Sequence, residues 1–130
     1  MVCPIHVVCR HGSRFTNNLV VTKPHGGACM GLGGFEAGHG DGYSNNTCAV
    51  LGGNASAADS VGSISQCAPA ENTMRGNTYF TPSGKGTLGG CGSTLIEELF
   101  AKDGVEEDSK VEKMPTDAQL VDYAKSWLGD

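Results

Sequence analysis

Residues 11–18 read HGSRFTNN and residues 39–46 read HGDGYSNN, so one polar phrase occurs twice, 28 positions apart. The two copies share the His-Gly start and the Asn-Asn end, and Phe15 in the first corresponds to Tyr43 in the second. A weaker copy at residues 70–80, AENTMRGNTYF, keeps the second Asn and has Met at the aromatic position. Intervals of 28 and 31 residues are typical of solenoids, in which each unit buries its apolar side against its neighbour.

Each copy leads into a short β-prone segment without a helical period, which predicts β-coils rather than helical hairpins. The expected strands lie at Leu19–Val21, Thr47–Leu51 and Thr78–Phe80. Stacked coils lie about 4.8 Å apart, so an Asn at the same bend of each coil can bond to the backbone of the next. We therefore expect a ladder formed by Asn18, Asn46 and Asn77.

Composition and charge limit the function classes. The 130 residues include 20 Gly, and only 6% are aromatic and 18% charged, which indicates one turn-rich domain. The net charge of −5 offers no basic field for nucleic acid. The apolar stretch at the N-terminus is too short for a signal peptide or a membrane span. Neither nucleic acid nor a membrane is therefore expected as a partner.

Six cysteines without a CxxC pair favour disulfides or buried thiols over a zinc site. Two N-glycosylation sequons, which begin at Asn45 and Asn54, also fit a secreted or extracellular protein. The spacing leaves the disulfide pairing open. We interpret the recurrence of Cys29, Cys48 and Cys67 every 19 residues as accidental.

The character of the chain changes after residue 92, so we expect β-helix coils over 1–92 and a helical cap over 93–130. Capping boxes predict a short helix in 93–104 and an amphipathic helix in 114–129. The acidic segment 105–113 between them is expected to be a solvated connector. The apolar stripe of the last helix, centred on its Trp, should be buried against an open end of the solenoid.

The series FTNNLVV, GHGDGYSNNTCAVLGG and NTMRGNTYFTPSGKG resembles the last coils of right-handed parallel β-helix proteins of the pectate-lyase-like, carbohydrate-active kind. The tail resembles the ends of some members, with Gly104, Asp108, Ser109 and Val111 in a connector and Pro115, Thr116, Asp117, Leu128 and Gly129 in a final helix. The resemblance implies an all-β fold, a short right-handed parallel β-helix with a C-terminal amphipathic capping helix. Complete members are longer, so it also implies a C-terminal portion or a shortened relative.

His39 and Asp41 are the first candidates for catalysis, because an imidazole and a carboxylate close together can act as general acid and base. His11 occupies the place of His39 in the first copy and would lie about 5 Å from it in stacked coils. The alternative is that His-Gly opens a tight turn and that Asp41 is a turn residue.

The candidate substrate-binding residues are Arg14, Glu36, Arg75 and Lys85. A glycosidase needs two carboxylates beside the sugar, and Glu36 or Asp59 could serve with Asp41. A lyase needs a basic residue as the base and a cation such as Ca²⁺ to neutralise the uronate carboxylate. No other cofactor is expected, and no metal ligands are assigned.

Two functions follow from these observations. The first is a domain that binds or processes polysaccharide, similar to glycoside hydrolases or polysaccharide lyases. The second is a non-catalytic structural or assembly subunit, whose exposed N-terminal coil edge pairs with another protein chain. β-Helices carry out many functions, so the sequence leaves open whether the protein is an enzyme.

Overall fold

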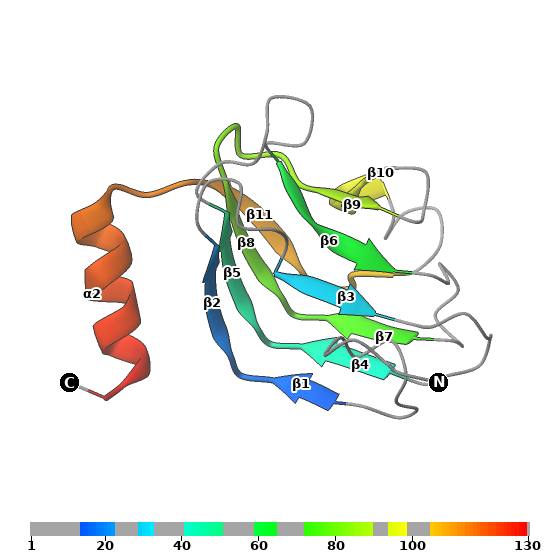
Figure 1. The fold of residues 1–130 in the computed structure, drawn as a ribbon, viewed down its shortest axis with the longest axis horizontal. Coiled ribbons are helices and arrows are strands. Elements are labelled where there is room, and N and C mark those ends of the chain that lie inside the picture. The colour runs from blue at the N-terminus through cyan, green and yellow to red at the C-terminus, as the bar shows by residue number, and fades with distance from the viewer. Residues whose placement is uncertain are drawn as a thin grey trace, which may run out of the picture.

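The computed structural model describes residues 14–22, 29–32, 41–50, 59–64, 72–89, 94–98 and 105–129. Within these ranges the chain is predominantly β, and it ends in one helix that lies beside the strands (Figure 1).

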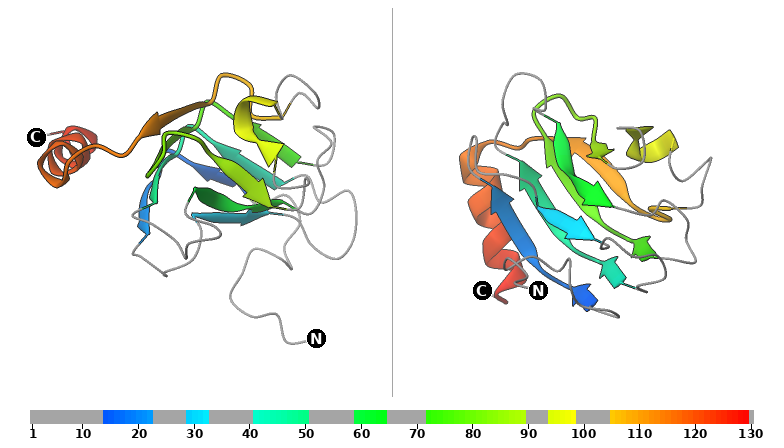
Figure 2. Two further views of the ribbon diagram at one scale, coloured as in Figure 1. Left: turned by 90° about the horizontal axis from the view of Figure 1, so that it is seen from above. Right: turned by 45° about the vertical axis from the view of Figure 1, so that its right-hand side comes forward.

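The chain passes through three sheets in the same order, round after round (Figures 1 and 2). The first round consists of β1 (Arg14–Thr16), β2 (Leu19–Thr22) and β3 (Met30–Leu32). The second consists of β4 (Asp41–Ser44), β5 (Thr47–Val50) and β6 (Ser60–Ile64). The third consists of β7 (Asn72–Arg75), β8 (Thr78–Thr81) and β9 (Thr87–Gly89). The strands expected from the repeated phrase are therefore confirmed, with shifts of one residue at their ends.

Equivalent strands of successive rounds pair in parallel and form three separate sheets. Their strand orders are β1-β4-β7, β2-β5-β8-β11 and β3-β6-β9-β10, where β11 is Lys110–Lys113 and β10 is Thr94–Leu95. The pairing of β10 with β9 is antiparallel, whereas the other strand pairs of the described residues are parallel. Residues 96–98 continue from β10 as a helical turn. The rest of the helix expected in 93–104 lies outside the described residues.

The repeated phrase sets the register between rounds. Phe15 is the pairing partner of Tyr43, and Tyr43 is the partner of Met74. Tyr43 and Met74 are buried in the core, and Phe15 packs against it. Alternate residues of the same strands face outward, because side chains in a strand alternate between its two faces.

The expected Asn ladder is confirmed at the bend between the first two sheets. The Oδ1 atom of Asn46 accepts the backbone N–H of Asn18 at 2.9 Å, and Oδ1 of Asn77 accepts that of Asn46 at 3.0 Å. The hydroxyl of Ser109 takes the next place and accepts the N–H of Asn77 at 2.9 Å. The residue before each of these four, Asn17, Asn45, Gly76 or Asp108, has positive φ. The αL conformation turns the chain sharply, and Asn, Asp and Gly adopt it most readily.

A disulfide joins the first two rounds inside the molecule. Cys29, just before β3, bonds to Cys48 on β5, whose side chain is fully buried. The interval of 19 residues between these two cysteines is thus the one that the disulfide spans. Cys67 lies outside the described residues.

The segment 105–113 is not the solvated connector expected from its acidic composition. Val105 and Glu106 are buried, Glu107 forms a parallel bridge with Arg75, and β11 pairs in parallel with β8. These residues form a fourth, partial round. The pairing groups of β8 and the end of the Asn ladder have their partners here, and of the acidic side chains only that of Glu106 is buried, whereas those of Glu107, Asp108 and Glu112 stay exposed.

The last helix, α2 (Asp117–Trp127), begins at the expected capping box, in which Thr116 and Gln119 bond reciprocally. It lies beside the outer face of the β2-β5-β8-β11 sheet (Figure 2) rather than over an end of the stack. The Tyr123 hydroxyl is 2.9 Å from Oγ1 of Thr47, and its ring packs edge-on against Phe80. None of the helix residues is buried, and Trp127 is 37% exposed. The expected burial of the apolar stripe is therefore wrong.

Candidate functional site

The outer face of the β1-β4-β7 sheet collects polar side chains from three rounds. Its residues form two rows across the strands, Arg14 beside Gly42 beside Thr73, and Thr16 beside Ser44 beside Arg75. The two arginines and two threonines are exposed, and Ser44 is half-buried. We call this surface, defined by these six residues, the polar face. Its strands are about 4.8 Å apart.

Arg14 lies flat on the polar face because its neighbour has no side chain. A Cβ atom built on Gly42 would be 2.7 Å from Nη1 and 3.0 Å from Cδ of Arg14. Real Cβ contacts of this length do not occur, so any other residue at position 42 would displace the Arg14 side chain. Gly42 itself is buried under that side chain. The repeat breaks at this position, with Arg14 in the first copy and Gly42 in the second. Gly42 thereby leaves the space that the Arg14 side chain occupies.

Arg75 lies at the other end of the polar face, on β7. Its Nη2 atom is 3.9 Å from Oδ2 of Asp108, and both side chains are more than half exposed. An ion pair of this length and exposure contributes little to stability. Since strands are about 4.8 Å apart and residues along them about 3.3 Å, the Cα atoms of Arg14 and Arg75 are separated by roughly 12 Å. The two guanidinium groups can therefore contact two separate points of one extended ligand.

The structure places two of the residues singled out in the sequence on one face of a sheet. Arg14 and Arg75 share the polar face, and Asp41 is the first residue of β4, where its backbone pairs with Asn72. His39 and Glu36 lie outside the described residues, as does His11. Lys85 is exposed in the turn that joins β8 to β9, beyond the end of β8 that is farther from β7.

The turn that carries Lys85 has a structural brace. Asp59 accepts hydrogen bonds from the backbone N–H of Ser83 at 3.1 Å and from its hydroxyl at 2.6 Å. The hydroxyl of Thr81 donates to the carbonyl of Lys85 at 2.7 Å. The carboxylate of Asp59 therefore holds two rounds together at this turn.

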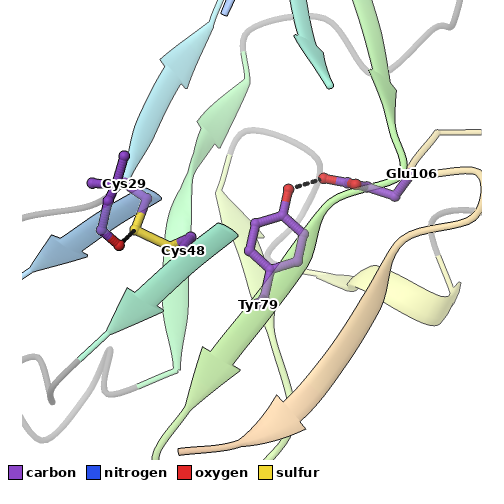
Figure 3. Close-up of a disulfide and its surroundings, with 5 residues drawn as sticks. Cys29, Cys48, Tyr79 and Glu106 are labelled. Atoms are coloured by element: carbon purple, nitrogen blue, oxygen red, sulfur yellow. Dashed lines mark hydrogen bonds between the residues drawn. A yellow bond between two sulfur atoms is a disulfide. The ribbon is translucent and has the colours of Figure 1, made fainter. Parts of the chain in front are cut away.

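Sequence reasoning missed Glu106, the most unusual ionisable residue of the described part. It is 2% exposed and has a positive φ of 67°. Its carboxyl group accepts hydrogen bonds from the hydroxyls of Tyr79 and Ser109 and from Nδ2 of Asn77 at 3.2 Å. Figure 3 shows the bond from Tyr79 in the interior, where the disulfide also lies. The sequence contains one indication of this cluster, since Ser109 follows Asn77 by 32 positions, close to the repeat interval.

Burial raises the pKa of Glu106, and the three hydrogen bonds oppose that shift without cancelling it. Burial and the nearby Glu106 charge also raise the pKa of Tyr79 well above its usual range and that of Tyr43 to about 12. No described residue bonds to the Tyr43 hydroxyl. Although shifted pKa values are common in active sites, this cluster is sealed from a polymeric substrate. We interpret it as the closure of the Asn ladder.

In the part of the chain that the structure describes, no three His, Cys, Asp or Glu side chains are grouped closely enough to hold a metal ion. No helix in the same part is both long and apolar enough to cross a membrane.

The chain matches no protein-family model, no curated protein and no solved structure. Any assignment of function therefore depends on the chemistry of the polar face and on the sequence resemblance.

Proposed function

We propose that this chain is a short right-handed parallel β-helix of the pectate-lyase-like kind that binds polysaccharide on its polar face. The repeated passage through three parallel sheets supports the solenoid part of this proposal. The right hand follows from a general rule, since nearly all crossovers between parallel strands of one sheet are right-handed.

The single observation that carries the binding proposal is the position of Arg14 across Gly42. Among the residues whose side chains the structure describes, the ion pairs are Arg75–Asp108 and Lys110–Glu112, and neither involves the Arg14 guanidinium. A guanidinium presents paired N–H donors that match a carboxylate. Hydroxyls of Thr16, Ser44 and Thr73 surround it on the same face. These groups suit an acidic polysaccharide, whose uronate carboxylate meets Arg14 while its hydroxyls meet the threonines and serine.

A catalytic activity on the polysaccharide would use residues of the same sheet. Asp41 directly precedes Gly42 on β4, so its backbone is one residue from the place where Arg14 lies. We propose His39 and Asp41 as the general acid and base, and Glu36 as a further substrate contact. A lyase reaction would use Ca²⁺ to neutralise the uronate carboxylate. We also propose secretion, because a disulfide such as Cys29–Cys48 is maintained in oxidising compartments.

Binding is tested by calorimetric titration with polysaccharides that do or do not contain uronic acids. Arg14→Ala and Arg75→Ala should each weaken binding of the acidic polymer about tenfold, the loss of one charge-assisted contact. Gly42→Ala should weaken it similarly, because the new methyl group displaces an unaltered Arg14. The fold should tolerate this change, since the displaced atoms belong to a flexible side chain.

Lys85→Ala is the matched control, because it removes a cation of similar exposure from a different part of the surface. Full affinity in both arginine variants would exclude the polar face as the binding site. Loss of affinity in Lys85→Ala alone would place the binding site at the β8–β9 turn. Catalysis is followed by reducing-end release and by the absorbance of unsaturated uronates. Unchanged turnover in both His39→Ala and Asp41→Ala would exclude these residues as acid and base.

A further inference from the structure

The Asn ladder has a closed end and an open end. At the fourth round the N–H of Ser109 donates to the carbonyl of Glu106 at 3.1 Å, and its hydroxyl donates to the Glu106 carboxyl group. Every ladder group there has a partner within the same round. At the first round Asn18 donates to Thr16 and Asn46, but no described residue donates to its Oδ1. In Asn46 and Asn77 the equivalent oxygen accepts the N–H of the round before.

The sheet edges show the same asymmetry. β1, β2 and β3 are each the terminal strand of their sheet in the described structure. The edge strand β2 reads Leu-Val-Val-Thr and contains no charge and no Pro, and Val21 is 45% exposed. The opposite edge strand, β11, reads Lys-Val-Glu-Lys, and its Lys110 and Glu112 form an ion pair of 2.8 Å. Charged residues on an edge discourage pairing with another strand, and a neutral β-branched edge permits it.

The backbone of β2 is prepared for a further strand. The N–H of Thr47 donates to the carbonyl of Asn18, and that of Thr78 donates to the carbonyl of Asn46. The N–H groups at the equivalent position in β2, Leu19, and two residues later at Val21 therefore face away from β5, toward the open side. The disulfide from Cys29 to Cys48 fixes the first round to the second, so the edge is held in place.

From these observations we propose that the first-round edge, defined by β1, β2 and β3, is a dimerisation surface for a second copy of this chain. A head-to-tail arrangement would bring the charged β11 edge and the closed ladder against it, and charged side chains on an edge disfavour such pairing. A head-to-head arrangement with a two-fold axis through β2 pairs the two β2 strands in antiparallel orientation, so that neutral residues meet neutral residues.

The same axis exchanges the other two sheets. Arg14 on β1 of one copy then lies opposite β3 of the other, which reads Met-Gly-Leu, and like charges do not meet. Such an interface is isologous and closes as a dimer, without further growth. This inference is independent of polysaccharide binding, because the edge surface and the outward polar face are different surfaces.

The test is sedimentation of the full chain over a range of concentrations. Wild type should reach twice the chain mass of 13.4 kDa, and Val21→Lys should raise the dimer dissociation constant at least about tenfold, because two lysines face each other near the axis. Val121→Lys is the matched control, since it makes the same change at an exposed position of α2 (52% exposed). It should dimerise like wild type.

Amide hydrogen exchange identifies the strand involved. The amides of Leu19 and Val21 should become more protected as wild-type concentration rises and should not do so in Val21→Lys. A wild type that stays monomeric at all concentrations would overturn the proposal and indicate an edge covered within the chain. A dimer lost in Val121→Lys but kept in Val21→Lys would also overturn it and place the interface on α2.

Discussion

Removal of the three ladder amides one at a time should destabilise the protein by amounts that increase toward the closed end. Asn77→Ala should have the largest effect. Its Oδ1 accepts the buried N–H of Asn46, and its Nδ2 donates to the carbonyl of Tyr43 at 2.9 Å and to Glu106 at 3.2 Å. Water cannot replace these bonds, because Asn77 is fully buried. With about 1 kcal/mol for each net bond and about 1 to 3 kcal/mol for the stranded partners, the expected loss is about 3 to 5 kcal/mol.

Asn46→Ala removes bonds to Asn18 and to the carbonyl of Phe15. These partners are exposed or half-buried, so water replaces part of what is lost and about 2 to 3 kcal/mol is expected. Asn18→Ala affects an exposed residue and should cost less than about 1 kcal/mol. Asn77→Ser should recover part of the loss, because a Ser hydroxyl already serves as the acceptor in the fourth round.

The assay is urea unfolding under oxidising conditions, with the midpoint and the slope fitted for each variant. An unchanged slope shows that the same surface is exposed on unfolding. Equal losses at the three positions would refute the reasoning, because they would mean that solvent exposure does not govern the value of a ladder bond. A smaller loss at Asn77 than at Asn18 would refute it as well.

Three other predictions concern single features of the fold. Burial raises the pKa of Glu106 above its ordinary value of 4.5, so the folded protein binds this proton more tightly than the unfolded chain does. The resulting stabilisation is complete below pH 4.5 and is lost as pH rises through the folded-state pKa. Thermal unfolding from about pH 4 to about pH 8 should show this decline in wild type and less of it in Glu106→Gln, and identical profiles would contradict the assigned shift. The double variant Cys29→Ala/Cys48→Ala should lose about 3 kcal/mol in urea unfolding, the value for a closed loop of this length, and a loss below about 1 kcal/mol would argue against the bridge. Gly76→Ala should cost at least the roughly 1 to 2 kcal/mol of αL strain expected for Gly129→Ala, because φ is positive at both positions and a Cβ at 76 would also displace the amide end of the exposed Asn45 side chain, whereas the one at 129 meets open space. A smaller loss of melting temperature in Gly76→Ala than in Gly129→Ala would contradict this reasoning.

The parts of the fold that could be predicted from the sequence are those in which the same residue types recur at the repeat interval. Asn18, Asn46 and Asn77 occupy one bend in successive rounds, so their spacing revealed the register of β1, β2 and their equivalents. β3, β6 and β9 follow no shared phrase and were not located individually. The fourth round was missed because Glu106, Glu107 and Asp108 have the composition of a solvated segment, although the ladder above them requires a partner.

The candidate site was predictable to a smaller degree. The unrepeated Arg14 was noticed in the sequence, but its contact with Gly42 depends on two rounds lying side by side. Lys85 was grouped with Arg14 by charge alone, and the turn after β8 carries it elsewhere. The helix α2 was predictable from its capping box, whereas its docking through Tyr123 depends on the outer face of a sheet, which local periodicity does not describe.

The ladder also shows where this chain tolerates a change in length. Successive ladder residues are separated by 28, 31 and 32 positions, yet two residues always join the first strand of a round to the second. The variation is confined to the longer connections, such as the nine residues between β5 and β6. A reporter peptide inserted there should leave the fold intact, since lengthening a connection between two strands costs little. The same peptide inserted between β4 and β5 would separate an αL residue from its Asn, and the round could no longer stack.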